Sequence, residues 1–174
     1  MKKIHYTYLD SRRIDSNTKQ LVQDFTVIDK RNKEWNVPTG YISDGKSVPE
    51  VLEAIIGDPF EGVTEPASWV HDFECEYARF YLDKNLKKEN YINYDILKAE
   101  KKRGRKISSQ KDTHRIFREL VEYEMSINEE YGWGITWPHN WKGWQFTRSK
   151  LMWLGVRIWN HSWNPFNKNT SKWK

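Results

Sequence analysis

The sequence predicts an α+β fold, in which an N-terminal antiparallel β-hairpin or small sheet packs on a bundle of three to four helices. Residues 4–42 contain short runs rich in β-branched and aromatic side chains, separated by polar turns, which is typical of strands. From residue 64 onward, apolar side chains instead recur at helical spacing. Because the strands all precede the helices, an α+β arrangement is favoured over alternating strand and helix units. The 174 residues fit a single domain, 1–174.

A β-hairpin is the clearest of the predicted strand elements. Residues 21–28 have the composition of one strand, residues 29–33 form a polar turn, and the strand pattern resumes at residues 35–37. Two further short strands are expected, at residues 4–9 and 41–42.

The predicted helices have capping residues and apolar faces. A short helix is expected at residues 47–56, and a stronger one at residues 64–82, where aromatic side chains recur every three or four positions. The next helix begins after Ser108 or Ser109, either of which can cap it. A last helix is expected at residues 146–159.

Charge is distributed unevenly along the chain. The formal net charge is +5. Residues 98–106 hold six basic residues and one acid, and residues 131–174 hold seven basic residues and no acid. The rest of the chain is therefore acidic. We predict an acidic body, a basic insertion at residues 83–106, and an aromatic basic tail at residues 160–174.

Composition excludes several classes of protein. Aromatic residues make up 15% of the chain, which argues against a disordered protein. The single cysteine, Cys75, rules out an internal disulfide. There is no apolar run of about 18 residues, so we expect no membrane partner, and the first residues do not have the pattern of a signal peptide.

Three polar segments are candidates for chemistry. Asp44 and Ser47 stand where a strand ends and a helix begins, so they either form a turn or face a cleft. His71 and Asp72 lie inside the helix at residues 64–82, either as a hydrogen-bonded core histidine with its acid or as a base that an acid orients. Asp112 lies in the first turn of a helix, where an acid is favoured by the dipole even without a function.

A divalent metal is the cofactor that these residues would suit. No His or Cys cluster has the spacing of a zinc site. A metal would instead be held by Asp44, Asp72 and Asp112 with His71 nearby, and carboxylate oxygens favour Mg, Mn or Ca. Cys75 is expected to be a reduced structural residue, although His71 lies one helical turn away.

These segments, in this order, resemble the family called domain of unknown function 1353, found in bacteriophages and bacterial genomes. Residues 37–49 resemble its V-P-x-G-F-x-T-D-x-A-S-x-P segment, residues 67–72 its A-A-x-x-H-D helix, and residues 107–117 its I-S-R-x-x-A-D-x-x-F helix. Residues 151–163 are similar to its closing aromatic helix. The resemblance covers residues 20–82 and 107–163.

The resemblance implies one joint polar site rather than three separate turns and caps. That site would comprise Asp44, Ser47, His71, Asp72 and Asp112. The family supplies no reaction, and a shared polar core that holds helices together would give the same pattern. The sequence departs from the family pattern in three places: at Glu50, at Ser109 and Lys111, and in the length of residues 83–106.

Two basic regions could form contact surfaces. In the insertion, we expect residues 98–106 to be a solvated loop, and Lys101, Lys102, Arg103 and Arg105 are weak candidates for binding nucleic acid. Near the C-terminus, aromatic and basic side chains alternate in a predicted loop, which suits a contact surface or a lid. Its residues are Trp137, Trp141, Trp144, Lys142 and Arg148.

Several functions are compatible with these features. The first is a bacteriophage accessory protein with a hydrolase-like, metal-assisted activity, in which His71, Asp72, Asp44 and Ser47 are catalytic. The second is a virion or adaptor component that binds a protein partner through its Trp-rich basic C-terminal region. The third is a nucleic-acid-binding or anti-defence protein. The expected location is the host cytoplasm or the phage virion.

Overall fold

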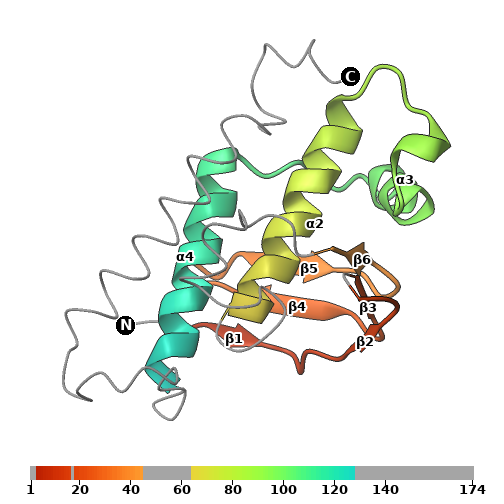
Figure 1. Cartoon of the computed structure of the whole chain (residues 1–174). Coiled ribbons are helices and arrows are strands. Elements are labelled where there is room, and N and C mark those ends of the chain that lie inside the picture. The colour runs from red at the N-terminus through yellow and green to blue at the C-terminus, as the bar shows by residue number, and fades with distance from the viewer. Residues whose placement is uncertain (1–2, 17, 45–63, 128–174) are drawn as a thin grey trace, which may run out of the picture.

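The structure is a computed structural model, and it describes residues 3–16, 18–44 and 64–127. Within these ranges, six strands come first, followed by three α-helices and one short 3-10 helix, and Figure 1 shows their arrangement. The strands are β1 (His5–Tyr6), β2 (Ser11–Arg13), β3 (Lys19–Leu21), β4 (Phe25–Ile28), β5 (Glu34–Val37) and β6 (Ile42–Ser43). The helices are α2 (Glu65–Leu82), η2 (Lys88–Asn90), α3 (Tyr94–Lys102) and α4 (Gln110–Ile127). The predicted α+β class is confirmed.

The strands form two small antiparallel sheets. One has the order β1-β4-β5 and the other the order β2-β3-β6. The predicted hairpin is present as β4 and β5, with Phe25 opposite Val37 and Val27 opposite Trp35. Asn32 adopts a positive φ of 64° in its turn, a conformation that asparagine tolerates better than most residues.

The single strand predicted at residues 21–28 is in fact two strands that belong to different sheets. Leu21 ends β3, and Phe25 begins β4. Between them, the Asp24 carboxylate accepts a hydrogen bond from the backbone N–H of Thr39 at 2.7 Å, so this segment turns a corner. The strand predicted at residues 4–9 is shorter than expected, and the β2–β3 hairpin was not predicted.

The two long helices pack against each other and cover the strands (Figure 1). Helix α2 confirms the prediction at residues 64–82, and Pro66 stands in its first turn, where a missing N–H costs nothing. Helix α4 begins after Ser109, whose Oγ accepts a hydrogen bond from the backbone N–H of Asp112 at 3.1 Å. Ser109 is therefore the N-cap.

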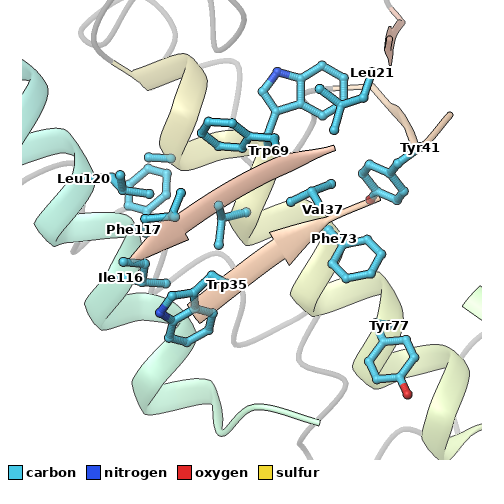
Figure 2. Packing of buried hydrophobic residues seen from close by; sticks show 14 of the residues in the cluster. Leu21, Trp35, Val37, Tyr41, Trp69, Phe73, Tyr77, Ile116, Phe117 and Leu120 are labelled. Atoms are coloured by element: carbon cyan, nitrogen blue, oxygen red, sulfur yellow. The ribbon is translucent and has the colours of Figure 1, made fainter. Parts of the chain in front are cut away.

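Aromatic and aliphatic side chains from both sheets and both long helices meet in one core (Figure 2). The largest fully buried side chains include Trp35, Tyr41, Trp69, Phe73 and Tyr77. Tyr41 contacts both Trp69 and Phe73 edge to face, with ring centroids 6.2 and 5.1 Å apart. These contacts fix β6 against the middle of α2, which is where the polar residues of interest lie.

The interpretation of residues 98–106 as a solvated loop is wrong for most of that segment, because α3 extends to Lys102. Leu97 on this helix is fully buried, and Tyr91 just before it packs edge to face on Phe80 at 5.2 Å. The region predicted as an insertion, residues 83–106, therefore contributes side chains to the core.

Several predictions fall outside the described residues. These are the helices expected at 47–56 and 146–159, Ser47, and the aromatic basic tail. Within the ranges that the structure does describe, no helix has both the length and the apolar character needed to cross a bilayer.

Candidate functional site

Helix α2 carries the central residues of the candidate site. His71, Asp72 and Cys75 lie in its middle turns, and both His71 and Asp72 are buried. His71 and Cys75 are four residues apart, so they lie one above the other on the same side of the helix. Cys75 is only partly buried, and it is a free thiol. The thiol is therefore the most accessible of these three groups.

Strand β6 supplies a hydrogen bond that fixes the orientation of Asp72. The Ser43 hydroxyl donates to Asp72 Oδ2 at 2.5 Å, and both residues are buried. The other oxygen, Oδ1, lies 3.6 Å from Nδ1 of His71. Asp72 thus connects the serine of the strand to the imidazole of the helix.

The imidazole of His71 has a different neighbour on each of its remaining sides. Its Nε2 lies 3.7 Å from Sγ of Cys75. The ring of His114, on α4, stacks on it with centroids 5.8 Å apart and an interplanar angle of 20°. Phe117 contacts it edge to face at 5.5 Å. We call Ser43, Asp72, His71, Cys75 and His114 the His71 cluster.

The protonation state of His71 is set by opposing effects. Burial lowers its pKa, whereas the negative charge of a Cys75 thiolate and the Asp72 carboxylate raise it, and the net result is a pKa of about 10. The raised pKa favours the imidazolium form of His71 when Cys75 is a thiolate. An imidazolium beside a sulfur atom stabilises the thiolate form of the cysteine, which is the nucleophilic form.

A second layer of polar side chains holds β6 beside α2. Asn93, just before α3, accepts a hydrogen bond from the Ile42 N–H and donates one to the Ile42 carbonyl, both at 2.8 Å. It also donates to Glu76 at 2.8 Å. Burial raises the pKa of Glu76, and Tyr41 is a further hydrogen-bond partner of this carboxyl. Since Ile42 precedes Ser43, these contacts fix the serine that binds Asp72.

Asp112 belongs to a different group of charges. Its carboxylate accepts from Ser109 Oγ at 2.7 Å, and this bond lowers its pKa. Arg115 lies 3.5 Å away and also binds Asp29 at 2.9 Å and Glu119 at 3.0 Å. We call Asp29, Asp112, Arg115 and Glu119 the Asp29 cluster. It joins the β4–β5 turn to α4.

The predicted metal ligands do not converge within the described ranges. Across residues 3–16, 18–44 and 64–127, no group of three or more His, Cys, Asp and Glu side chains is placed to hold a metal ion. Asp44, Asp72 and Asp112 therefore do not form the predicted carboxylate site there. Ser47, predicted beside Asp44, lies outside the described residues.

The basic residues predicted for nucleic acid have different environments. Arg105 is largely buried, binding Glu74 at 2.6 Å and Glu100 at 3.3 Å, so it joins α2 to α3 instead of facing a ligand. Lys101 lies over the ring of Tyr81, with Nζ 4.8 Å from the centroid. Lys102 and Arg103 are exposed. The contact surface predicted near the C-terminus lies outside the described residues. Its members are Trp137, Trp141, Trp144, Lys142 and Arg148.

Sequence reasoning missed three members of the His71 cluster. Cys75 was interpreted as structural, although its spacing from His71 is the signal that places the two side chains together. Ser43 was passed over for its neighbour Asp44. His114 was not among the candidates, because its contact with His71 depends on the packing of α4 on α2, which no local pattern shows.

Comparisons with known proteins identify relatives without a stated activity. A region of 57 residues is 46% identical to the uncharacterized protein y4jT of Sinorhizobium fredii (strain NBRC 101917 / NGR234). This match covers 33% of the chain but only 17% of y4jT, so the chain spans a small part of that relative. No solved structure matches the chain. The sequence profile of the family described as "Protein of unknown function (DUF1353)" matches residues 19–130, and the chain therefore belongs to this family.

Proposed function

We propose that this protein is a hydrolase-like enzyme that uses Cys75 as its nucleophile. One observation supports the proposal, namely the continuous series of contacts from Ser43 through Asp72 and His71 to Cys75. In this series a serine orients an acid, the acid lies beside an imidazole, and the imidazole lies beside a partly exposed thiol. Nucleophile, base and orienting acid in this order are the common arrangement of covalent hydrolysis.

The proposed reaction is acyl transfer to water. The Cys75 thiolate attacks the carbonyl carbon of an ester, thioester or amide, forming a C–S bond, and His71 gives its proton to the leaving group as the bond to that group breaks. The now neutral His71 accepts a proton from water, which attacks the thioester and releases the acid. The thiolate and the imidazolium are then restored. Asp72 stabilises the imidazolium and holds its ring in place.

The contacts of 3.6 and 3.7 Å that His71 makes with Asp72 and Cys75 are longer than ordinary hydrogen bonds. Such lengths are common in enzymes without substrate, where catalytic hydrogen bonds shorten only in the complex. A metal-assisted hydrolysis that uses His71, Asp72, Asp44 and Ser47 remains a prediction. A role as a bacteriophage protein also remains a prediction.

The reactivity of Cys75 tests this proposal, and the chain has no other cysteine. We would measure the rate of alkylation by iodoacetamide from pH 5 to 9, for the folded protein and for the same protein in urea. The folded protein should react faster than the unfolded chain at pH 6, because an imidazolium beside a cysteine favours the reaction of its sulfur as a nucleophile. In His71→Gln this advantage should disappear.

The matched control is His5→Gln, which changes an exposed histidine on β1 in the same way. It should react like the unmodified protein. A folded Cys75 that reacts more slowly than the unfolded chain across the whole pH range would contradict the proposal.

A second measurement addresses the covalent step. The activated ester p-nitrophenyl acetate should acetylate Cys75, as detected by mass spectrometry, and turnover should be lost in Cys75→Ser. Turnover that persists in Cys75→Ser but needs added Mg²⁺ or Mn²⁺ would instead favour the metal-assisted reaction.

A further inference from the structure

A row of lysines and aromatic rings lies along α3 and the C-terminal end of α2. We call Tyr81, Tyr94, Lys98, Lys101 and Lys102 the α3 face. Lys98 Nζ is 5.7 Å from the Tyr94 ring centroid, and Lys101 Nζ is 4.8 Å from the Tyr81 ring centroid. Lys98 and Lys102 are exposed, and the side chain of Tyr81 is 41% exposed.

The positive charge of this face is not neutralised by the acids of α3. Glu100 is already bound to Arg103 at 2.6 Å and to Arg105 at 3.3 Å. Asp95 is bound to Lys88 at 2.9 Å. Among the residues that the structure describes, Lys98, Lys101 and Lys102 form no ion pair with a carboxylate. Three cations are therefore available to an anionic ligand.

Two further cations of this region, Arg103 and Arg105, are bound to acids, which separates them from the α3 face. Arg105 lies over the ring of Phe73 at 4.5 Å and binds the buried Glu74, so it stabilises the junction of α2 and α3. Arg103 is held by Glu100. The sequence run at residues 98–106 thus contains both structural cations and available ones, and only the structure distinguishes them.

The exposed ring of Tyr81 determines which polyanion fits best. A phosphate backbone needs only cations, whereas a partly exposed aromatic ring beside a cation offers a stacking surface for an unpaired base. Bases in a duplex are already stacked and do not reach such a ring. We propose that the α3 face binds single-stranded nucleic acid, with lysines on the phosphates and a base stacked on Tyr81. This proposal is independent of the activity proposed for Cys75.

Fluorescence anisotropy with labelled oligodeoxythymidine tests the proposal on the full chain. Binding should weaken as salt increases, because each phosphate contact releases counterions. The triple variant Lys98→Gln, Lys101→Gln, Lys102→Gln should bind roughly tenfold more weakly, with a salt slope reduced by about 2.

A control variant with the same loss of charge separates a local surface from overall charge. Lys3, Arg13 and Lys111 are exposed and lie outside the α3 face, so changing all three to Gln should leave binding nearly intact. Thermal unfolding of both triple variants should show that they fold, and Lys98→Gln, Lys102→Gln without the change at Lys101 separates binding from the contacts that the half-buried Lys101 makes with the Tyr81 carbonyl and the Phe80 ring.

The contribution of stacking is measured with Tyr81→Ala. This variant should lose roughly tenfold in affinity for oligodeoxythymidine but almost nothing for an abasic oligonucleotide of the same length, and Tyr81→Phe should restore binding.

Three results would overturn the proposal. The first is the absence of binding to oligodeoxythymidine at low salt. The second is an equal loss of affinity in the two triple variants. The third is binding to phosphatidylserine vesicles that is as strong as binding to the oligonucleotide and that Tyr81→Ala leaves unchanged, since this would identify a lipid surface as the ligand.

Discussion

The Asp29 cluster and the His71 cluster each contain a buried acid, Asp29 and Asp72, yet their contacts differ in kind. The Asp29 carboxylate accepts four hydrogen bonds, from the backbone N–H groups of Arg31 and Lys33 at 2.8 Å, from Trp35 Nε1 at 3.1 Å and from Arg115 at 2.9 Å. In the His71 cluster, the imidazole instead meets Asp72 and Cys75 at 3.6 and 3.7 Å.

This difference distinguishes a structural network from a candidate catalytic one. The Asp29 carboxylate accepts four hydrogen bonds from the protein, so its oxygens have no further lone pair with which to bind a ligand. It stabilises the fold by accepting hydrogen bonds from buried donors. An imidazolium with longer contacts and a partly exposed thiol beside it can still exchange a proton. The family resemblance pointed to one joint site, whereas the structure separates Asp112 from His71 and Asp72.

The largest expected effect comes from breaking the Asp29 cluster. Asp29→Ala leaves Arg115 and the Trp35 indole N–H without their acceptor, and the loss of one partner of a buried ion pair costs about 3–5 kcal/mol. Urea unfolding followed by circular dichroism would measure this change. Glu34→Ala, at an exposed position of the same hairpin, should change stability by less than about 0.5 kcal/mol. A small effect of Asp29→Ala would show that this cluster is not structural.

The pH dependence of stability should distinguish the two clusters by direction. Burial opposes ionisation of Asp29, but its hydrogen bonds from the Lys33 and Arg31 backbone, Arg115 and Trp35 outweigh burial and lower its pKa. Because the folded pKa is below the unfolded one, near 4, this stabilisation is present above about pH 4 and is lost as the pH falls further.

His71 should show the opposite dependence. Its folded pKa of about 10 is above the unfolded value. Its contribution is therefore complete below about pH 6.5 and is lost as the pH rises toward the folded pKa, with a total on the order of 2 kcal/mol or more. Urea unfolding of the unmodified protein and of His71→Gln at several pH values would measure it. A stability difference between the two that grows with pH would contradict this assignment.

Removing the serine of the His71 cluster should have a smaller effect. Ser43→Ala deletes a hydrogen bond to a buried carboxylate, which is worth about 2 kcal/mol. It should also reduce the alkylation rate of Cys75, because Asp72 loses the group that orients it. Ser126→Ala changes an exposed serine of α4 and is the matched control for both measurements. An unchanged alkylation rate in a destabilised Ser43→Ala protein would limit Ser43 to a structural role.

The smallest expected effect is at the N-cap of α4. Ser109→Ala removes the acceptor for the Asp112 N–H and should lower the free energy of unfolding by about 1 kcal/mol. It should leave the alkylation rate of Cys75 unchanged, since Asp112 belongs to the Asp29 cluster. A change in that rate would show that the two clusters are coupled through α4.

Local patterns in the sequence predicted the parts of the fold that depend on neighbouring residues. Helix α2 and helix α4 were found from the spacing of their apolar side chains and from Ser109. Helix α3 was missed because its lysines resemble a solvated charge run, although Leu97 is buried and Ile96 packs against the core. The break between β3 and β4 was missed because Val22, although β-branched, lies in the corner between the sheets.

The candidate site was predictable only in part, for the same reason. His71 and Asp72 are adjacent in the sequence and were identified together. The contact between Ser43 and Asp72 joins residues 29 positions apart, and that between Arg115 and Asp29 joins residues 86 positions apart. Such pairs depend on how the helices pack on the sheets, which the spacing of residues along one element does not reveal.

The contact between Asn93 and Ile42 also satisfies backbone groups at the end of a sheet. Among the described strands, β6 lies at the edge of its sheet, and unpaired N–H and C=O groups at a sheet edge can pair with a strand of another molecule. The carboxamide of Asn93 occupies the N–H and the C=O of Ile42 at once, much as the backbone of a neighbouring strand would. One side chain thus satisfies both backbone groups of Ile42 beside the candidate site, and we expect Asn93→Ala to expose them to pairing with another strand.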